Sequence, residues 1–195
     1  MQPLLLTDEQ RDFQAALRQM CDDKIAPRAA AVDRAAEFPW DSFKDCVAME
    51  LSALGLPVEH GGEGADHVTQ AIMVEELARA CASTSLTMLI SKLGMIPVIQ
   101  WGSEDLKARY LPGVASGALQ ASYCLSEADA GSDVASMRTR AVRDGDDYVI
   151  TGSKQWITNA GISDLYTVFA KTDPAGGSRG VSAFVVEAGW GVQVA

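Results

Sequence analysis

Two short segments carry residue types that could do chemistry together. Residues 123–133 read YCLSEADAGSD, and residues 152–161 read GSKQWITNAG. Small side chains in the first segment let backbone N–H groups approach a ligand, and free N–H groups beside a hydroxyl suit a phosphate or the edge of a flavin. In the second, the indole of Trp156 could cover a flat ring, and in an extended chain the hydroxyl of Thr158 would face the same side. Taken alone, each segment also fits a structural role, as an Asp-rich turn or as a tryptophan in a sheet.

The elements that must position these segments change in character near residue 119. Before this point apolar residues recur at helical spacing, and a capping box at Thr7 and Gln10 begins the first helix. The apolar positions of the first two helices are Phe13, Leu17, Met20, Cys21, Trp40, Phe43, Val47 and Leu51. After it, β-branched and aromatic residues dominate, with turn-forming residues at 144–146 and 174–177.

Runs of helices followed by runs of strands indicate an α+β chain with two domains. We predict an all-helical domain over residues 1–118, in which the polar-poor residues 86–93 lie deep in the core. An antiparallel β-barrel or sandwich-like domain should follow over residues 119–195, incomplete at its C-terminal end. The glycine-rich residues 60–64 form a loop, but they lack the spacing of a dinucleotide fingerprint or a P-loop.

Prolines and glycines predict where helices end. Pro27 should bend or restart the chain after the first helix, and Gly94 and Pro97 are candidate breaks or kinks. Ser103 caps a last helix that should end near Pro112.

Composition and charge argue against several classes of function. The 195 residues carry 16 basic and 26 acidic side chains, a net charge of −10, so we expect no nucleic-acid partner. Four distant cysteines without a C-x-x-C pair, and only two histidines, predict no metal site and reduced, half-buried thiols. No basic residue precedes the short apolar run at residues 4–6, so we expect no signal peptide. No apolar run approaches the ~20 residues that a membrane span needs. A soluble, cytoplasmic protein is expected.

Together, the two segments resemble motifs of the acyl-CoA dehydrogenase family. The middle domain of that family typically carries a Y-x-x-T-E-P-x-A-G-S-D segment and, after one strand pair, a G-x-K-x-W-I-T-N segment. Residues 123–133 and 152–159 follow both patterns in this order. The resemblance runs from about Leu6 to Ala195 and also includes residues 25–27, 54–57 and 180–186.

The resemblance implies FAD as the cofactor and gives roles to matching positions. In the family, the backbone at the position of Leu125 and the hydroxyl at that of Ser126 hold the flavin ring. The hydroxyl matching Thr158 meets the reactive side of the ring, and the residues matching Trp156 and Ile157 lie along it. Fixed donors aimed at a ring that gains negative charge on reduction would stabilise the reduced state.

The remaining expected contacts lie in the first motif. Gly131 and Ser132 match positions near the FAD pyrophosphate and the thioester arm of CoA, so Ser132 is expected to contact both cofactor and substrate. Tyr123, which opens the motif, completes the expected cofactor-binding set. Ser126 replaces the common threonine and keeps its hydroxyl, whereas Ala128 replaces the usual proline and loses a fixed φ.

The implied reaction is the α,β-dehydrogenation of an acyl-CoA thioester to the trans-2-enoyl-CoA, as in the β-oxidation of fatty acids. A carboxylate removes the α-proton while the β-hydrogen leaves as hydride to the flavin. In the family that base lies in a C-terminal helical domain that this sequence lacks, so we expect no catalytic residue in this chain and no turnover by the chain alone. Glu127 is the alternative base, but the family places this position in the polar network of the loop. Truncation, proteolysis or a split gene would explain the end at Ala195.

Partners follow from the same resemblance. We expect an acyl-CoA substrate, an electron-transferring flavoprotein as acceptor, and a homo-oligomer, dimeric or tetrameric, in the intact protein. Weak FAD binding and exposed apolar surface are expected of the chain alone. An oxygen-using flavoprotein of the same fold and a non-catalytic flavin- or acyl-CoA-binding subunit completed by a partner chain are the alternatives. The sequence does not indicate the length or branching of the acyl group.

Overall fold

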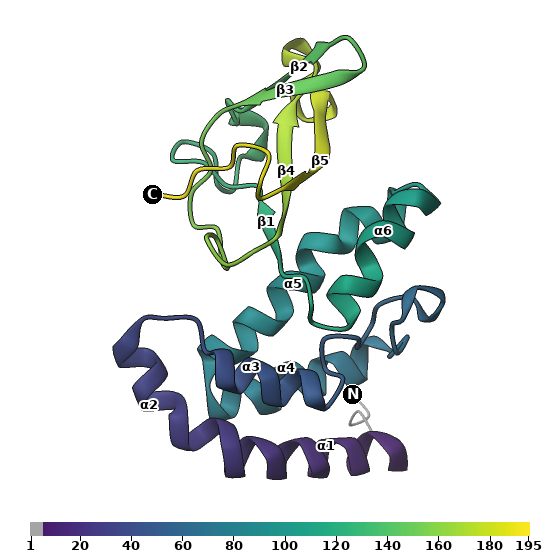
Figure 1. The fold of residues 1–195 in the computed structure, drawn as a ribbon, viewed down its shortest axis with the longest axis vertical. Coiled ribbons are helices and arrows are strands. Elements are labelled where there is room, and N and C mark those ends of the chain that lie inside the picture. The colour runs from purple at the N-terminus through teal and green to yellow at the C-terminus, as the bar shows by residue number, and fades with distance from the viewer. Residues whose placement is uncertain (1–5) are drawn as a thin grey trace, which may run out of the picture.

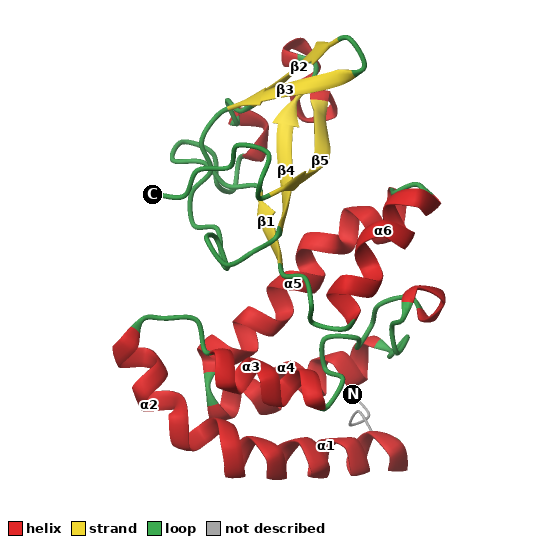
Figure 2. Cartoon of the chain, viewed as in Figure 1, coloured by secondary structure: helices red, strands yellow, loops and turns green. Residues whose placement is uncertain are grey.

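The computed structural model describes residues 6–195, so the expectation for a signal peptide falls largely outside the described residues. A helical part and a sheet part lie at opposite ends of the molecule, with α5 running between them (Figures 1 and 2). The helices are α1 (Asp8–Met20), α2 (Ala26–Ala35), α3 (Trp40–Ala48), α4 (His67–Ala80), α5 (Ala82–Trp101) and α6 (Glu104–Ala115). The strands are β1 (Ala121–Cys124), β2 (Arg140–Asp144), β3 (Asp147–Thr151), β4 (Leu165–Lys171) and β5 (Val181–Glu187). The predicted order of helices followed by strands is confirmed.

The first helix begins as the sequence predicts. The Gln10 N–H donates to Thr7 Oγ1 at 3.2 Å, and the Thr7 N–H donates to Gln10 Oε1 at 3.1 Å, which completes the capping box. The chain then widens into a π-helical turn, Cys21–Ile25, before α2 restarts with Pro27 in its first turn. Proline is tolerated there because the first N–H groups of a helix have no partner within it.

Helix α5 is the centre of the fold. It lies against α3, α4 and α6 on the helical side and against β1 and β4 on the sheet side. Neither Gly94 nor Pro97 ends it, so of the predicted breaks or kinks a break is absent. Helix α6 ends at Ala115, three residues after Pro112, near which its end was predicted. By length and composition alone α5 could cross a membrane, a test that core helices of soluble proteins also pass.

A glycine is needed where α5 meets the sheet. A Cβ atom added to Gly94 would lie 3.1 Å from both Ala121 Cβ and Ser122 O of β1. The close approach is held by Thr167 of β4, whose Oγ1 donates to Gly94 O at 2.6 Å. The two parts of the chain are therefore joined through the backbone of α5.

The five-stranded sheet is mixed rather than purely antiparallel. The hairpin β2–β3 and the pair β4–β5 are antiparallel, as predicted, but β1 and β2 both pair with β4 in the parallel sense. Parallel pairing arises because the chain leaves β1, makes the β2–β3 hairpin, and returns through a long loop to β4. The described sheet does not close into a barrel.

The core divides into two clusters of buried residues, and only some of the apolar residues that were predicted to be buried lie in them. Leu17, Cys21, Phe43 and Leu51 are buried in the cluster between α1, α3 and α4, and all four cysteines are buried and unpaired. The second cluster joins α5 and α6 to the start of the sheet. Residues 86–93 do not all lie deep in the core, because Leu86 and Leu89 are 46% and 36% exposed. One face of α5 thus remains open to solvent.

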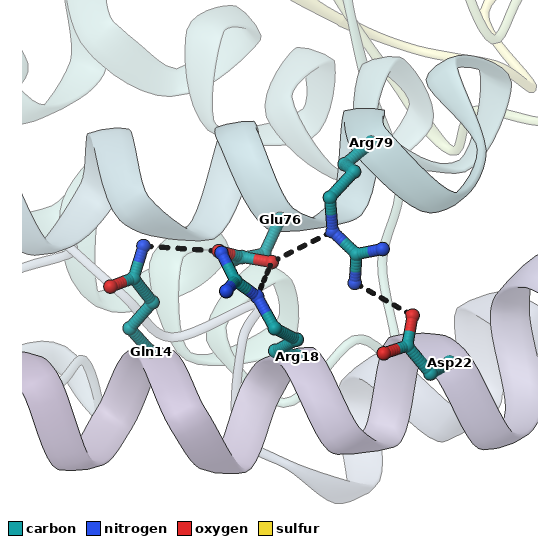
Figure 3. Close-up of polar contacts among 5 residues, drawn as sticks. All are labelled: Gln14, Arg18, Asp22, Glu76 and Arg79. Atoms are coloured by element: carbon teal, nitrogen blue, oxygen red, sulfur yellow. Dashed lines mark hydrogen bonds and ion pairs between the residues drawn. The ribbon is translucent and has the colours of Figure 1, made fainter.

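A buried carboxylate fastens α1 to α4, a feature that the sequence pattern did not predict. Glu76 of α4 is fully buried and accepts hydrogen bonds from Gln14 Nε2 (3.0 Å), Arg18 Nε (3.0 Å) and Arg79 Nε (3.1 Å) (Figure 3). Arg79 also reaches Asp22 at 2.8 Å. Hydrogen bonding to Arg18 outweighs burial and lowers the pKa of Glu76, so the carboxylate is charged at neutral pH.

Candidate functional site

The structure brings the two segments together at the end of β1. The first segment leaves β1 at Leu125, and the second runs beside it before the chain returns to β4. The Gln155 N–H donates to Ser126 O at 2.9 Å, and Lys154 Nζ donates to Leu125 O at 3.0 Å. Segments separated by nearly thirty residues in the sequence therefore share one site.

Glu127 is the polar centre of this contact. Its carboxylate accepts the backbone N–H groups of Arg138 (2.6 Å) and Thr139 (3.0 Å), the Thr139 hydroxyl (2.5 Å) and Lys154 Nζ (2.8 Å). The Glu127 and Lys154 side chains are only 9% and 10% exposed. Burial alone would raise the pKa of Glu127, but the four donors together lower it to about 2. A carboxylate with this pKa and these partners holds a loop in place and is a poor proton acceptor.

The second segment is not the extended chain that was expected. Trp156 lies in a bend with φ +61°, and a turn follows, with Asn159 at φ +65°. The extended backbone on which that expectation rested is therefore absent. No described strand pairs with residues 152–161, so nothing imposes the alternation of a sheet on them.

Trp156 stands out in this bend. Its side chain is 84% exposed, although a bulky L-residue in the left-handed region is conformationally strained. A strained, exposed indole contributes nothing to the core of this chain. It offers a large, exposed flat surface one residue after Gln155, whose N–H reaches the first segment.

The structure leaves two predicted hydroxyls available at the site. Thr158 uses its backbone carbonyl to accept from Ser122 Oγ at 2.8 Å, and Ser126 uses its carbonyl to accept from Gln155. Among residues 6–195 no hydrogen bond is made to the side-chain hydroxyl of either residue. Ile157 and Leu125 are half-buried.

The glycine loop of the first segment is open on its outer side. Glu127 and Ala130 exchange backbone hydrogen bonds of 3.0 and 3.2 Å, which close a tight turn with Ala128 exposed at its tip. A Cβ atom added to Gly131 would meet nothing within 4 Å, and Ser132 is exposed beside it. This part of the loop has room for a ligand against its backbone.

Tyr123 lies on the sheet rather than in the loop. Its half-buried ring packs against Phe169 with ring centroids 4.9 Å apart, and burial raises the pKa of the phenol. In the described chain its visible contribution is to hold β1 against β4.

Sequence reasoning missed the residues that support the site. Lys154 and Ser122 were not selected, although Lys154 lies within the second motif. Because Lys154 lies two positions before Trp156, its sequence position suggests a role at the site, but the sequence does not show that its partner is the distant Glu127. The pairing of β1 with β4 had to be known before Ser122 could be placed under Thr158.

Comparisons with known proteins identify the family. Residues 7–118 match the acyl-CoA dehydrogenase N-terminal domain, and residues 122–195 match the acyl-CoA dehydrogenase middle domain. The chain therefore belongs to the acyl-CoA dehydrogenase family.

Individual relatives and solved structures resemble the chain over most of its length. The "Probable acyl-CoA dehydrogenase fadE25" of Mycobacterium leprae is 48% identical over 181 residues, which cover 93% of this chain and 46% of that protein. A glutaryl-CoA dehydrogenase from Mycobacterium smegmatis, solved in complex with FADH2, superposes with a TM-score of 0.86 at 31% identity over 93% of this chain and 46% of its own. The prolyl acyl carrier protein oxidase AnaB superposes with a TM-score of 0.87 at 28% identity, over 94% and 50%. The chain spans about half the length of the curated relatives that it matches.

Proposed function

We propose that this chain supplies the FAD-binding part of an acyl-CoA dehydrogenase that converts acyl-CoA thioesters to trans-2-enoyl-CoA. The observation that carries the proposal is the contact between Leu125–Ser126 and Lys154–Gln155, which brings the segment with the exposed Trp156 up to Ser126. Membership of the family and the likeness to a structure solved with FADH2 support it.

The residues present fit a flavin. Trp156 offers a flat apolar surface, and the hydroxyls of Ser126 and Thr158 are donors without partners among the described residues. We propose that these residues, Ile157 and the backbone at Leu125 hold the ring, with Tyr123 in the same cofactor-binding set. FAD, when bound, would accept the hydride from the β-carbon of the substrate.

The glycine loop is the proposed site for the charged part of the ligands. Gly131 leaves open space against its backbone, and Ser132 adds an exposed hydroxyl. Backbone N–H groups and a hydroxyl suit the pyrophosphate of FAD, and the same serine is proposed to contact the thioester arm of the substrate. Ala128, where proline is usual, leaves the tip of this loop with a freer φ.

Glu127 is not proposed as the base that removes the α-proton. Its carboxylate is occupied by Lys154 and by the Arg138 and Thr139 N–H groups, and its pKa is about 2. We propose no catalytic residue among residues 1–195 and expect this polypeptide to bind ligands without turnover. Its role is to position the cofactor.

Further parts of the proposal rest on family membership. We propose a domain boundary near residue 118, an electron-transferring flavoprotein as acceptor, a homo-oligomeric assembly, and a cytoplasmic role in fatty acid β-oxidation. The likeness to AnaB favours one alternative, an oxidase of the same fold that passes electrons to oxygen.

Spectral titration tests the proposed function. Chain loaded with FAD would be mixed with an acyl-CoA under anaerobic conditions, with the corresponding free fatty acid as the control. Perturbation of the flavin absorption by the acyl-CoA, but not by the fatty acid, is expected. A flavin spectrum that responds to neither would contradict an acyl-CoA site beside the flavin. With a polypeptide that turns over, consumption of oxygen would favour the oxidase over the dehydrogenase.

A further inference from the structure

Asn159 occupies an unusual position directly after Thr158. Its side chain is 9% exposed, and its backbone is left-handed with φ +65°. The side-chain Nδ2 donates to the carbonyl of Thr87 in α5 at 3.2 Å. Its own carbonyl accepts from the N–H groups of Ile162 (3.0 Å) and Ser163 (2.9 Å), which closes the turn before β4.

The left-handed backbone and the buried hydrogen bond to Thr87 together favour asparagine here. Most L-residues are destabilised in the left-handed region because Cβ approaches the following carbonyl, whereas asparagine visits it readily. Glycine would also accept this backbone but cannot donate to Thr87. The requirement for a left-handed backbone and a buried donor at one position is met by Asn159.

The turn is fixed from a second direction by β1. Ser122 Oγ lies 2.8 Å from Thr158 O and 2.8 Å from Ser163 Oγ, so one serine clamps both ends of the turn. Thr158 is therefore held between a strand on one side and, through Asn159, a helix on the other. The backbone that carries its side chain cannot move away unless at least one of these hydrogen bonds breaks.

We infer that Asn159 is a positioning residue, which fixes the shape of residues 156–159 and locks this loop to α5. It acts through Trp156 and Thr158, so the inference rests on the proposed flavin site. The bond to Thr87 also joins the loop to the segment of α5 whose Leu86 and Leu89 are exposed.

Two substitutions separate the two contributions of this residue. Asn159→Gly keeps a permissive backbone and removes only the bond to Thr87, whereas Asn159→Ala removes both advantages. Ile72→Val, a conservative change in the buried face of α4, is the control for a general loss of stability. The Kd for FAD would be measured by the quenching of flavin fluorescence, and hydrogen exchange at the Ile162 and Ser163 amides would be followed without FAD.

The expected Kd rises about tenfold in the glycine variant, because a buried carbonyl loses its partner and the loop spends less time in the binding shape. The alanine variant should lose about a further tenfold, because the left-handed backbone is then unfavourable. Exchange at both amides should accelerate in the two Asn159 variants and stay unchanged in Ile72→Val.

Wild-type affinity in Asn159→Ala, or unchanged exchange at the two amides, would overturn the inference. An equal rise in Kd in Ile72→Val would also overturn it, because the effect would then be one of general stability. Faster exchange in the Asn159 variants with no saturable FAD binding by the wild-type chain would refute the proposed function and leave Asn159 as the residue that positions the loop.

Discussion

Replacing Glu127 by glutamine should strongly destabilise the chain, because this carboxylate joins the two segments of the site. Its four donors come from Arg138, Thr139 and Lys154, and each is within hydrogen-bond distance. Glutamine has nearly the same shape but no charge. The substitution would leave the buried ammonium of Lys154 without a counter-ion.

The pKa of Glu127 sets the size of the effect. The folded chain lowers this pKa from its ordinary value of 4.5 to about 2, which corresponds to about 3 kcal/mol of stability at neutral pH. Because the pKa is depressed on folding, this stability is fully present above about pH 4.5. It is lost as the pH falls through the interval toward about 2.

Urea unfolding at pH 7 and at several lower pH values would measure the effect. Glu127→Gln should lower the free energy of unfolding by about 3 kcal/mol at pH 7 and flatten its acid dependence between about pH 4.5 and 2. Glu104→Gln is the control, because Glu104 makes its ion pair with Lys107 from a largely exposed position, and it should change stability by less than about 1 kcal/mol. A loss in Glu127→Gln no larger than in Glu104→Gln, or an unchanged acid dependence, would refute the reasoning.

Three other substitutions test separate parts of the structure. Glu76→Ala should lower the free energy of unfolding by about 2 to 3 kcal/mol in urea, because Gln14, Arg18 and Arg79 lose their shared acceptor while both arginines stay partly exposed to water; a loss below about 1 kcal/mol would contradict this role. Gly94→Ala should cost about 1 to 3 kcal/mol in thermal unfolding, because the new methyl group would press on Ser122 O of β1; unchanged stability would contradict a tight contact between α5 and β1 at this position. Trp156→Ala should raise the Kd for FAD about tenfold with little effect on stability. The control is Trp101→Ala, because Trp101 is also largely exposed but lies at the end of α5, and this variant should keep the wild-type Kd. An equal change of Kd in the two variants would argue against contact between Trp156 and the flavin ring.

Local features of the fold could be predicted from the sequence. The capping box at Thr7 needs only a hydroxyl and an amide three residues apart, and the turn at residues 144–146 needs a glycine between two strand-forming runs. These signals are contained in a few neighbouring residues. The structure reproduces them because tertiary packing does not oppose them.

Features that depend on distant parts of the chain could not be predicted in this way. Composition predicts strands but not their direction, and the parallel pairing of β1 with β4 depends on how the intervening loop is routed. Leu86 and Leu89 have the composition of a core helix, yet the sheet covers another face of α5. A pattern of apolar residues does not tell which face of a central helix remains open.

The candidate site shows the same division. Both segments could be selected from residue types, but the left-handed backbone at Trp156 and Asn159 and the pairing of Glu127 with Lys154 were not visible. Each of these depends on a partner or a turn that only the folded chain supplies. The supporting residues of a site are harder to predict than the residues that it presents to a ligand.

The most direct test of the flavin site is the visible absorption spectrum of the chain after equilibrium dialysis against FAD. The wild-type chain and Trp101→Ala should bind the flavin saturably, whereas a variant with Trp156→Ala and Thr158→Val should bind it far more weakly. Equal binding by all three proteins, or no saturable binding by the wild-type chain, would contradict the claim that these two segments form a flavin site.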